Sequence, residues 1–249
     1  MIRETRWMVN RQASRIGRDI ATIPDTLRQW RTFWGQYQTY RQMAPADRQP
    51  NAYTLYPCVT DATDQTPVEP VYFYQDTWAF HRIFQAQPAR HVDVGSSHHF
   101  NGFMSRVLPV TMVDIRPLPV SLPNLDFVEG SILEMPFEDG TVESISSICV
   151  IEHIGLGRYG DPLDPQGSEK AIAEIQRITA PGGNIYVSVP IEKRNRTYFN
   201  AHRAFTIDTF TELFAPFEVI ETKFIVGNQL VDEPPTHNCV GCFHFRRSA

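Results

Sequence analysis

The pattern of hydrophobic and polar positions becomes regular from His91 onwards. Short apolar runs of strand length alternate there with stretches whose apolar residues recur at helical spacing. We expect strands at residues 92–94, 110–115, 125–130, from about 144, 184–190, 217–226 and 239–247. We expect helices at residues 101–107, 168–178 and 205–215. This alternation predicts an α/β fold, in which a mainly parallel sheet carries helices on both faces.

The helix starts and the last two strands carry more specific predictions. Ser168 is expected to cap the helix at 168–178, and Thr206 or Asp208 the helix at 205–215. The last two β runs are close in sequence. They could therefore pair antiparallel, with the last strand inserted beside the previous edge of the sheet.

The first 48 residues form a different pattern, which is basic and amphipathic. Apolar residues at gaps of three and four, from Ile16 to Tyr37, predict helical structure that Pro24 divides into two helices. Between Met1 and Arg48 the sequence has nine arginines and four acidic residues. This extension could pack its apolar stripe on the main domain, contact a membrane surface or a protein partner, or remain a mobile tail.

The chain therefore divides into three predicted parts. Residues 1–48 are the basic amphipathic helical extension, and residues 49–70, rich in Pro, Asp, Thr and Gln, are a linker or irregular segment. Residues 71–249 are the main domain, which opens with an aromatic-rich helix over residues 72–84.

Composition narrows the class of protein. The formal net charge of −5 disfavours a general nucleic-acid binder. No apolar run approaches the roughly 18 residues of a membrane span, and the N-terminus lacks the pattern of a secretory signal. The four cysteines are sparse, which favours a reducing, cytoplasmic location. The sequence leaves open whether the chain forms a homodimer.

Two strand ends carry the candidate cofactor chemistry. Residues 91–100, HVDVGSSHHF, resemble a buried strand that stops at a glycine turn, and residues 113–117, VDIRP, a strand that ends in an acid. Ligands of open α/β sheets bind beyond the carboxyl ends of the strands. Gly95 would let a ligand approach the backbone. Asp114 could accept hydrogen bonds from both hydroxyls of a ribose.

The residues around the glycine turn favour one nucleoside cofactor over another. Asp93 could orient the loop or meet the ammonium of a methionine moiety, and Ser96 and Ser97 offer hydroxyls and amides. A nicotinamide dinucleotide needs the G-x-G-x-x-G cradle for its pyrophosphate, whereas this loop has one glycine in the critical position. S-adenosylmethionine has no phosphate and suits the loop better.

With these residues in place, the chain from about Val71 to Arg247 resembles the class I S-adenosylmethionine-dependent methyltransferases. The strings VDVGS, VDIRP and APGGNIYVSVP carry this resemblance. The run EHIGLGRYGDPLDPQG at residues 152–167, with YFYQD and FNAHRAF, further resembles a little-characterised methyltransferase-like family. The resemblance implies a Rossmann-like seven-stranded sheet with an antiparallel last strand, and S-adenosylmethionine as cofactor. It supplies no substrate and does not cover the chain before about Pro50.

The resemblance also implies positions for the cofactor. Asp93, Gly95 and Ser96 would line the methionine and ribose side, and Asp114 would hold the ribose. The residues expected at the adenine are Ile115, Arg116, Ser131 and Ile132. Ser131 departs from the family pattern, because many members have an acid there that accepts from the adenine amino group.

The loop after the strand that starts near residue 144 holds the candidate catalytic groups. Positioning supplies most of the catalysis of methyl transfer, and a base is needed only for a weak nucleophile such as a hydroxyl. His153 is the first candidate base because an ordinary imidazole titrates near neutrality. The other candidate catalytic residues are Glu152, Asp161 and His202. The candidate substrate-binding residues are Arg158, Tyr159, Asp164 and Arg203. Alternatively, the Glu-His pair and Arg158 only hold the loop in place.

No metal is expected at either of two possible ligand sets. Glu152, His153 and Asp161 lack a recognisable ligand spacing. His237, Cys239, Cys242 and His244 could offer four ligands, but a strand alternates its faces and would point them in different directions.

The sequence therefore predicts a methyltransferase that moves a methyl group from S-adenosylmethionine to a small-molecule or glycan acceptor, at oxygen. Polar groups on the acceptor side favour a hydroxylated substrate, although Tyr72, Phe73, Tyr74 and Trp78 could line a site for an aromatic one. The alternatives are a non-catalytic module that acts through a partner and a nicotinamide-dependent enzyme acting on sugars.

Overall fold

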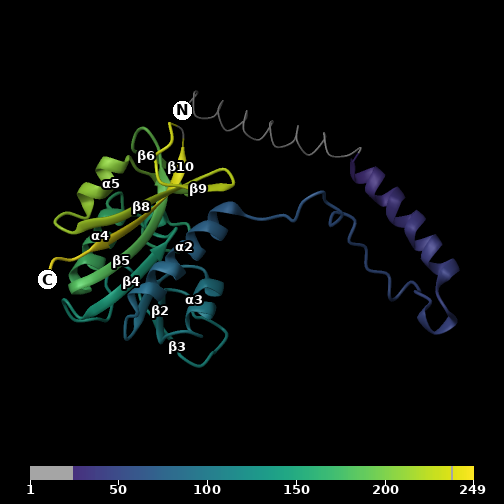
Figure 1. Ribbon diagram of the computed structural model, residues 1–249, viewed down its shortest axis with the longest axis horizontal. Helices are drawn as coiled ribbons and strands as arrows, with labels where there is room; N and C mark the ends of the chain where they lie inside the picture. Colours follow the sequence, from purple (N-terminus) through teal and green to yellow (C-terminus); the bar gives the residue numbers. More distant parts are fainter. Residues whose placement is uncertain (1–24, 237) are drawn as a thin grey trace. The chain divides into compact units, whose positions relative to one another are not determined.

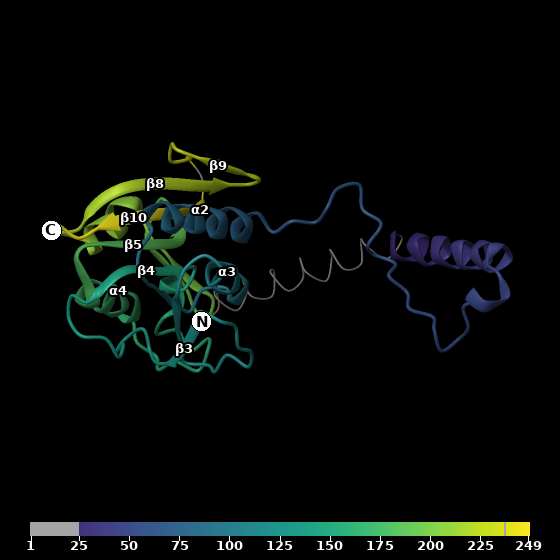
Figure 2. The same ribbon diagram turned by 60° about the horizontal axis from the view of Figure 1, so that its bottom comes forward.

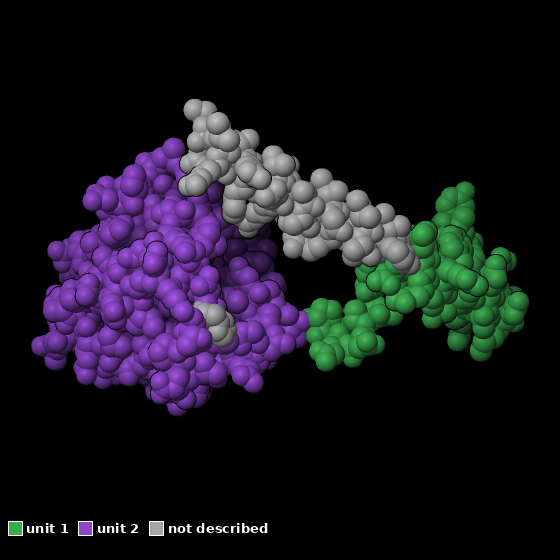
Figure 3. Space-filling model, turned by 90° about the horizontal axis from the view of Figure 1, so that it is seen from above, with its two compact units in different colours: residues 1–67 green, residues 68–249 purple. Residues whose placement is uncertain are grey.

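The computed structural model describes residues 25–236 and 238–249, and the chain divides into two compact units, residues 1–67 and 68–249 (Figure 3). The predictions for residues 1–24, including the break at Pro24, lie outside the described residues, as does His237.

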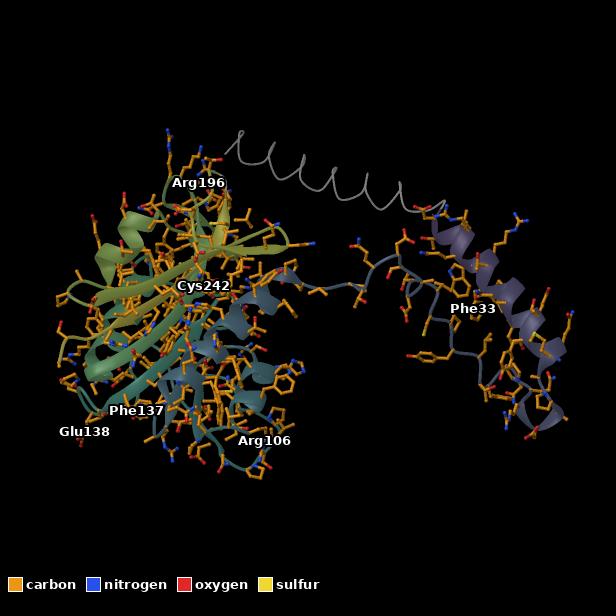
Figure 4. The ribbon with its side chains drawn as sticks, viewed as in Figure 1. Phe33, Arg106, Phe137, Glu138, Arg196 and Cys242 are labelled. Carbon is orange, nitrogen blue, oxygen red and sulfur yellow. The ribbon has the colours of Figure 1, made fainter. Side chains whose placement is uncertain are left out.

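In the first unit, residues 25–43 form a helix, and a short 3-10 helix, η1, follows at Ala46–Arg48. Four aromatic rings of the longer helix form a ladder of edge contacts, with centroids 5.3–5.7 Å apart. These rings belong to Trp30, Phe33 (labelled in Figure 4), Trp34 and Tyr37. The helical spacing expected for this part of the extension is therefore present.

The second unit is built on a sheet of eight strands in the order β3-β2-β1-β4-β5-β10-β8-β9 (Figure 1). The strands are β1 His91–Val94, β2 Val110–Asp114, β3 Leu125–Glu129, β4 Val142–Ile148, β5 Thr179–Ile191, β8 Glu218–Val226, β9 Gln229–Val231 and β10 Cys239–Arg246. The first five pair in parallel. β10 lies between β5 and β8 and runs antiparallel to both. The insertion predicted for the last strand is confirmed.

The sheet differs from the seven-stranded expectation at its far edge. A turn at Gly227, whose φ is +56°, folds β9 back onto β8 as an antiparallel hairpin and adds an eighth strand. Two further strands that the sequence did not suggest, β6 Arg196–Tyr198 and β7 His202–Ala204, pair with each other apart from the main sheet.

Helices cover both faces of the sheet, as expected (Figure 2). Helices α2 Pro70–Ala86 and α3 His98–Met104 pack on one face through Trp78, Ile83 and Met104. Helices α4 Gly167–Ile178 and α5 Ile207–Leu213 pack on the other, where their apolar side chains meet the sheet. Helix α3 begins three residues before its predicted start.

Two of the crossovers lack the helices that a strictly alternating pattern would supply. Residues 115–124, between β2 and β3, and residues 130–141, between β3 and β4, are described in full and contain no helix. Pro117, Pro119 and Pro123 fall in the first of these segments, and proline removes a backbone donor that a helix needs. This edge of the unit is consequently bordered by loops.

The two capping predictions have different outcomes. Thr206 caps α5, since its hydroxyl accepts from the amide of Thr209 at 3.1 Å, and the choice between Thr206 and Asp208 is settled. The prediction for Ser168 is wrong. Gln166 is the N-cap of α4, and the buried Ser168 hydroxyl instead donates to the carbonyl of Ile151 at 2.7 Å. Ser168 therefore fastens the helix to the loop after β4.

The cysteines of β10 point to opposite faces of the sheet. Cys239 packs with the core under α4 and α5, whereas Cys242 packs with the core under α2 and α3 (Cys242 is marked in Figure 4). Burial raises the pKa of both thiols. Among the described residues, no group of three or more His, Cys, Asp or Glu side chains could hold a metal ion. Within the same residues, no helix is long and apolar enough to cross a membrane.

Candidate functional site

A cavity of about 700 Å³ lies beyond the carboxyl ends of β1, β2 and β4. The loops after these three strands and after β3 supply most of its wall, and the start of α2 supplies the rest. Thirteen of the residues that the sequence predicted for the site line this cavity. Three of them are Gly95, Arg116 and Arg158. The other ten are Ser96, Ser97, Asp114, Ile115, Ser131, Ile132, Glu152, His153, Tyr159 and Asp161.

Gly95 forms the turn after β1 because no other residue fits there without strain. Its φ is +69°, in the left-handed region, and its amide donates to the carbonyl of Val113 at 2.9 Å. A Cβ at this position would lie 3.1 Å from Cγ1 of Val150. The turn therefore brings bare backbone to the cavity wall, as the sequence predicted.

Asp93 lies beneath that turn and is fully buried, so it does not line the cavity itself. Its carboxylate accepts from the Ser96 amide at 3.1 Å, from Asn101 Nδ2 at 2.7 Å and from the Ser146 hydroxyl. Burial raises the pKa of Asp93, while these donated hydrogen bonds oppose the rise. Of the two roles considered for Asp93, the geometry supports orienting the loop.

A buried histidine extends this network away from the cavity. Nδ1 of the His91 ring lies 2.8 Å from Oγ of Ser144, and Nε2 lies 2.9 Å from Oγ of Ser146. Because the Ser146 hydroxyl donates its hydrogen bond to Asp93, Nε2 of His91 must donate to Ser146, and Nδ1 of the neutral ring must accept from Ser144. Burial lowers the pKa of His91 to about 3, so the ring is neutral and holds Ser146 in place.

Asp114 ends β2, and its carboxylate is engaged by its neighbour Arg116. Oδ1 accepts from the amide and Nε of Arg116 at 2.8 and 3.2 Å, and Oδ2 from Nη2 at 3.1 Å. The guanidinium of Arg116 also stacks on the ring of Tyr159, 4.8 Å from its centroid. A ligand with a diol would compete with the side chain of Arg116 for this carboxylate.

The residues expected at the adenine form the wall beside Asp114. Ile115 is 40% exposed and could cover a flat ring, whereas Ile132 is 5% exposed and belongs to the core. The hydroxyl of Ser131 accepts from the amide of Leu133 at 3.2 Å, so it stabilises its own turn.

The other end of the cavity is built from the loop after β4. Glu152 lines it with only 2% of its surface exposed, and Oε2 of its carboxyl group is buried without a hydrogen-bond partner. Burial raises the pKa of Glu152 to about 8. At neutral pH this residue is therefore a carboxylic acid that can donate a hydrogen bond, rather than a carboxylate.

His153 lies beside Glu152, with Nε2 3.7 Å from Oε1 of Glu152. Nδ1 lies 2.6 Å from the carbonyl of Ala201, which can only accept, so Nδ1 carries the proton and Nε2 keeps a lone pair. Burial lowers the pKa of His153 to about 4. The expectation of a near-neutral pKa is wrong for this histidine, which is a neutral and weak base.

Arg203 and Asp164 do not line the cavity, although the sequence placed them with the substrate. Arg203 is 6% exposed and donates to the carbonyls of Ile154, Asp164 and Pro165 and to the hydroxyl of Ser168. Asp164 pairs with Lys170 at 2.6 Å. Both side chains stabilise the loop 154–167. This is the structural role that the sequence offered as an alternative for Glu152, His153 and Arg158.

The two other candidate catalytic residues, Asp161 and His202, make contacts that stabilise the fold around them. Asp161 lines the cavity, but Oδ2 of its carboxylate accepts from the Gly155 amide at 2.6 Å and turns the loop. His202 lies on β7 outside the cavity wall, where its ring packs on Tyr198 with centroids 4.9 Å apart.

A polar cluster that the sequence did not reveal lies beneath the end of the cavity formed by the loop after β4. The Oε1 atom of the buried Gln75, on α2, accepts from the Cys149 thiol and from the Ser188 hydroxyl, both at 3.0 Å. Cys149 has a φ of +54°, which is unusual for a residue with a Cβ, and lines the cavity. Tyr72, also on α2, lines the cavity, and it is one of the four aromatic residues that the sequence offered for an aromatic substrate. The helical spacing of α2 predicted which residues share a face, but not that this face reaches the carboxyl end of β4.

Comparison with known proteins gives the fold a class. The structure of the N-methyltransferase NodS from Bradyrhizobium japonicum WM9 in complex with S-adenosyl-l-homocysteine matches with a TM-score of 0.54 and 15% identity, over 76% of this chain and 94% of that one. A Burkholderia thailandensis 1,6-didemethyltoxoflavin-N1-methyltransferase, with bound 1,6-didemethyltoxoflavin and S-adenosylhomocysteine, matches with a TM-score of 0.51 and 15% identity, over 75% of this chain and 94% of that one. The chain thus has the Rossmann-like α/β fold of these methyltransferases.

The fold alone does not fix the reaction. The [4+2]-cyclase SpnF also matches, with a TM-score of 0.53 and 12% identity, over 70% of this chain and 82% of that one. A family model described as a Caenorhabditis protein of unknown function, DUF268, matches residues 132–230, which is less than half of the chain. No curated protein sequence matches.

Proposed function

We propose that the cavity binds S-adenosylmethionine and that the protein transfers its methyl group to a small-molecule or glycan acceptor, at oxygen. The observation that carries this proposal is the joint position of the Gly95 turn, the Asp114 carboxylate and the buried Glu152 carboxyl group around one cavity. Solved methyltransferases of the same fold that hold S-adenosylhomocysteine support it.

The residues present fit the proposed cofactor. Asp114 offers two acceptor oxygens to the ribose hydroxyls. The Gly95 turn offers a surface without a Cβ to the methionine side, and Ile115 offers an apolar face to the adenine. Bound S-adenosylmethionine would supply an electrophilic methyl group on a sulfonium. The protein would then need to place a nucleophile in line with it.

Glu152 and His153 are the residues placed to manage the proton of a hydroxyl acceptor. Glu152 lines the cavity, and the buried Oε2 of its carboxyl group has no partner within the protein, so its hydrogen-bonding capacity is unused. Nε2 of His153 keeps its lone pair toward Glu152. With a pKa of about 8, the Glu152 carboxylate is the stronger base of the two, and it forms as the pH rises.

The proposal is tested by calorimetric titration of the purified chain with S-adenosylmethionine and S-adenosylhomocysteine. We expect micromolar binding that Asp114→Ala weakens at least about tenfold, because the ribose loses charge-assisted hydrogen bonds. Arg116→Ala is the matched control: it removes the side chain that competes for the same carboxylate, so affinity should be kept or increased.

Absence of binding by the wild type would contradict the proposed cofactor. Equal loss in Asp114→Ala and Arg116→Ala would show that the ribose is not held by Asp114. Cofactor binding without turnover of any acceptor would favour the non-catalytic module acting through a partner.

A further inference from the structure

The acceptor end of the cavity holds a cation whose charge is not paired. Arg116 is engaged by Asp114, whereas Arg158 forms no ion pair with a carboxylate in the part of the chain that the structure describes. Nη1 of Arg158 donates to the carbonyl of Ala201 at 3.0 Å, and its guanidinium stacks on Tyr159, 5.1 Å from the ring centroid. The remaining donors of its planar fork are available to a ligand.

The acidic groups around Arg158 are committed elsewhere. Glu152 is protonated at neutral pH and does not neutralise the arginine. Asp161 accepts from the amides of Gly155 and Tyr159, at 2.6 and 3.3 Å. Glu69 accepts from the amide of Tyr72 at 2.9 Å, as the N-cap of α2. The Glu69 and Asp161 carboxylates thus accept from backbone amides, and neither forms a direct ion pair with Arg158.

A second guanidinium becomes available under the proposed function. Arg116 and Arg158 both stack on the ring of Tyr159, with 4.8 and 5.1 Å between guanidinium carbon and ring centroid. If ribose hydroxyls take the place of the Arg116 side chain on Asp114, the guanidinium loses its two hydrogen bonds there, from Nε and Nη2. Cofactor binding would then release a second planar fork beside the first.

We infer that the acceptor carries an oxyanion, either a carboxylate or a phosphate, that binds Arg158 at the cavity mouth, and that a neutral polar group of the same molecule meets Glu152. This inference rests on the proposed function and specifies its substrate class. Guanidinium forks match the geometry of carboxylate and phosphate oxygens. Glu152 lines the cavity, and its buried Oε2 atom has no partner, so we place the neutral polar group of the ligand at this carboxyl group.

The test uses the full chain and four small aromatic probes that differ in one group: benzoate, phenyl phosphate, benzyl alcohol and benzylamine. Binding is measured by ligand-observed NMR and calorimetry, with and without saturating S-adenosylhomocysteine. We expect at least one oxyanion probe to bind about tenfold more tightly than benzyl alcohol, which is the scale of a charge-assisted hydrogen bond. S-adenosylhomocysteine should increase that preference by freeing Arg116. Comparison of benzoate with phenyl phosphate separates the two oxyanions.

Arg158→Met should remove the preference for oxyanions while leaving affinity for S-adenosylhomocysteine unchanged, which also shows that the variant folds. Arg158→Lys keeps the charge but loses the fork, so it should retain part of the preference. Arg194→Met, a change at an exposed arginine outside the cavity, is the matched control and should leave all four affinities unchanged.

The inference is overturned if benzyl alcohol or benzylamine binds as tightly as the oxyanions, if no oxyanion binds at millimolar concentration, or if Arg158→Met leaves the preference intact. These results are distinguishable from failure of the proposed function. If S-adenosylhomocysteine binds but the oxyanion probes show no preference, the inferred substrate class alone is overturned. An oxyanion preference in a chain that does not bind S-adenosylhomocysteine overturns the cofactor.

Discussion

The two ends of the cavity differ in how their polar groups are paired. At the cofactor end, Asp93 receives three hydrogen bonds beneath the Gly95 turn, and Asp114 receives three from Arg116. At the acceptor end, Glu152 keeps an unpartnered oxygen and Arg158 keeps unused donors. Buried polar groups normally find partners within the protein. The difference therefore indicates that the Gly95 turn is held by bonds within the protein, whereas Glu152 and Arg158 keep hydrogen-bonding capacity for a ligand.

The largest effect is expected from Asp93→Asn, which tests whether the cofactor end is fixed by its buried network. An amide presents donors where the carboxylate accepted, so at least one buried donor loses its partner. We expect the free energy of unfolding to fall by about 3 kcal/mol in urea denaturation. Asp126→Asn, which breaks an exposed pair with Arg90, is the control and should cost less than about 0.5 kcal/mol. Equal costs at the two positions would mean that the network does not hold the turn.

Arg203→Met perturbs the acceptor end in the same way. Loss of its guanidinium leaves the buried carbonyls and the Ser168 hydroxyl without that donor, and we expect a cost of about 2 to 3 kcal/mol. The loop 154–167 should loosen, which limited proteolysis would detect, while affinity for S-adenosylhomocysteine changes less than about twofold. Comparable loss of cofactor affinity would show that the two ends are not separable.

Gly95→Ala separates backbone strain from crowding at the cofactor end. The left-handed φ and the approach to Val150 should together cost about 2 kcal/mol of unfolding free energy. Gly182→Ala is the matched control, since its φ of +75° is similar but no heavy atom lies within 4 Å of its Cβ. The difference between the two variants measures the contact with Val150. Identical costs would remove the argument that the turn is shaped by that contact.

The smallest effect is a pH dependence at Glu152. Its pKa in the folded protein, about 8, lies above its ordinary value of 4.5, so the folded state holds a proton that the unfolded state releases. Its contribution to stability is therefore full below pH 4.5 and is lost as the pH rises through 8. The lowered pKa values of His91 and His153 act oppositely, but only below pH 6.5.

Between pH 6.5 and 8, the wild type should lose about 1 to 2 kcal/mol of unfolding free energy that Glu152→Gln does not lose. Two titratable groups lie near Glu152. Burial raises the pKa of the Cys149 thiol, and the charge of Arg158 favours the Glu152 carboxylate and so opposes the rise in its pKa. Parallel stability curves for the wild type and the variant over this range would show that Glu152 is not protonated in the folded protein.

The sequence predicted the positions of cavity residues at strand ends better than those of residues from distant segments, for a physical reason. Gly95 and Asp114 meet at one cavity because parallel strands bring their carboxyl ends to one edge. The inserted β10 followed in the same way from two β runs close together in the chain. Features that depend on a few neighbouring residues, such as a strand end or a short connection, can therefore be predicted from the sequence.

The acceptor end depends on contacts between distant segments, which no local pattern reveals. Gln75 meets Cys149 and Ser188 only after α2 packs on the sheet. Arg203 was expected at the substrate, but burial under the loop 154–167 gave it four partners within the protein. The low pKa of His153 likewise depends on burial in the fold rather than on residue type.

The most direct test of the central claim is a crystal structure of the chain with S-adenosylhomocysteine. We predict that the ribose hydroxyls bond to Asp114 in place of the Arg116 side chain, that the homocysteine end lies over the Gly95 turn, and that the sulfur faces Cys149 and Glu152. A ligand bound elsewhere, or a ribose placed away from Asp114 while Arg116 keeps its hydrogen bonds, would contradict it.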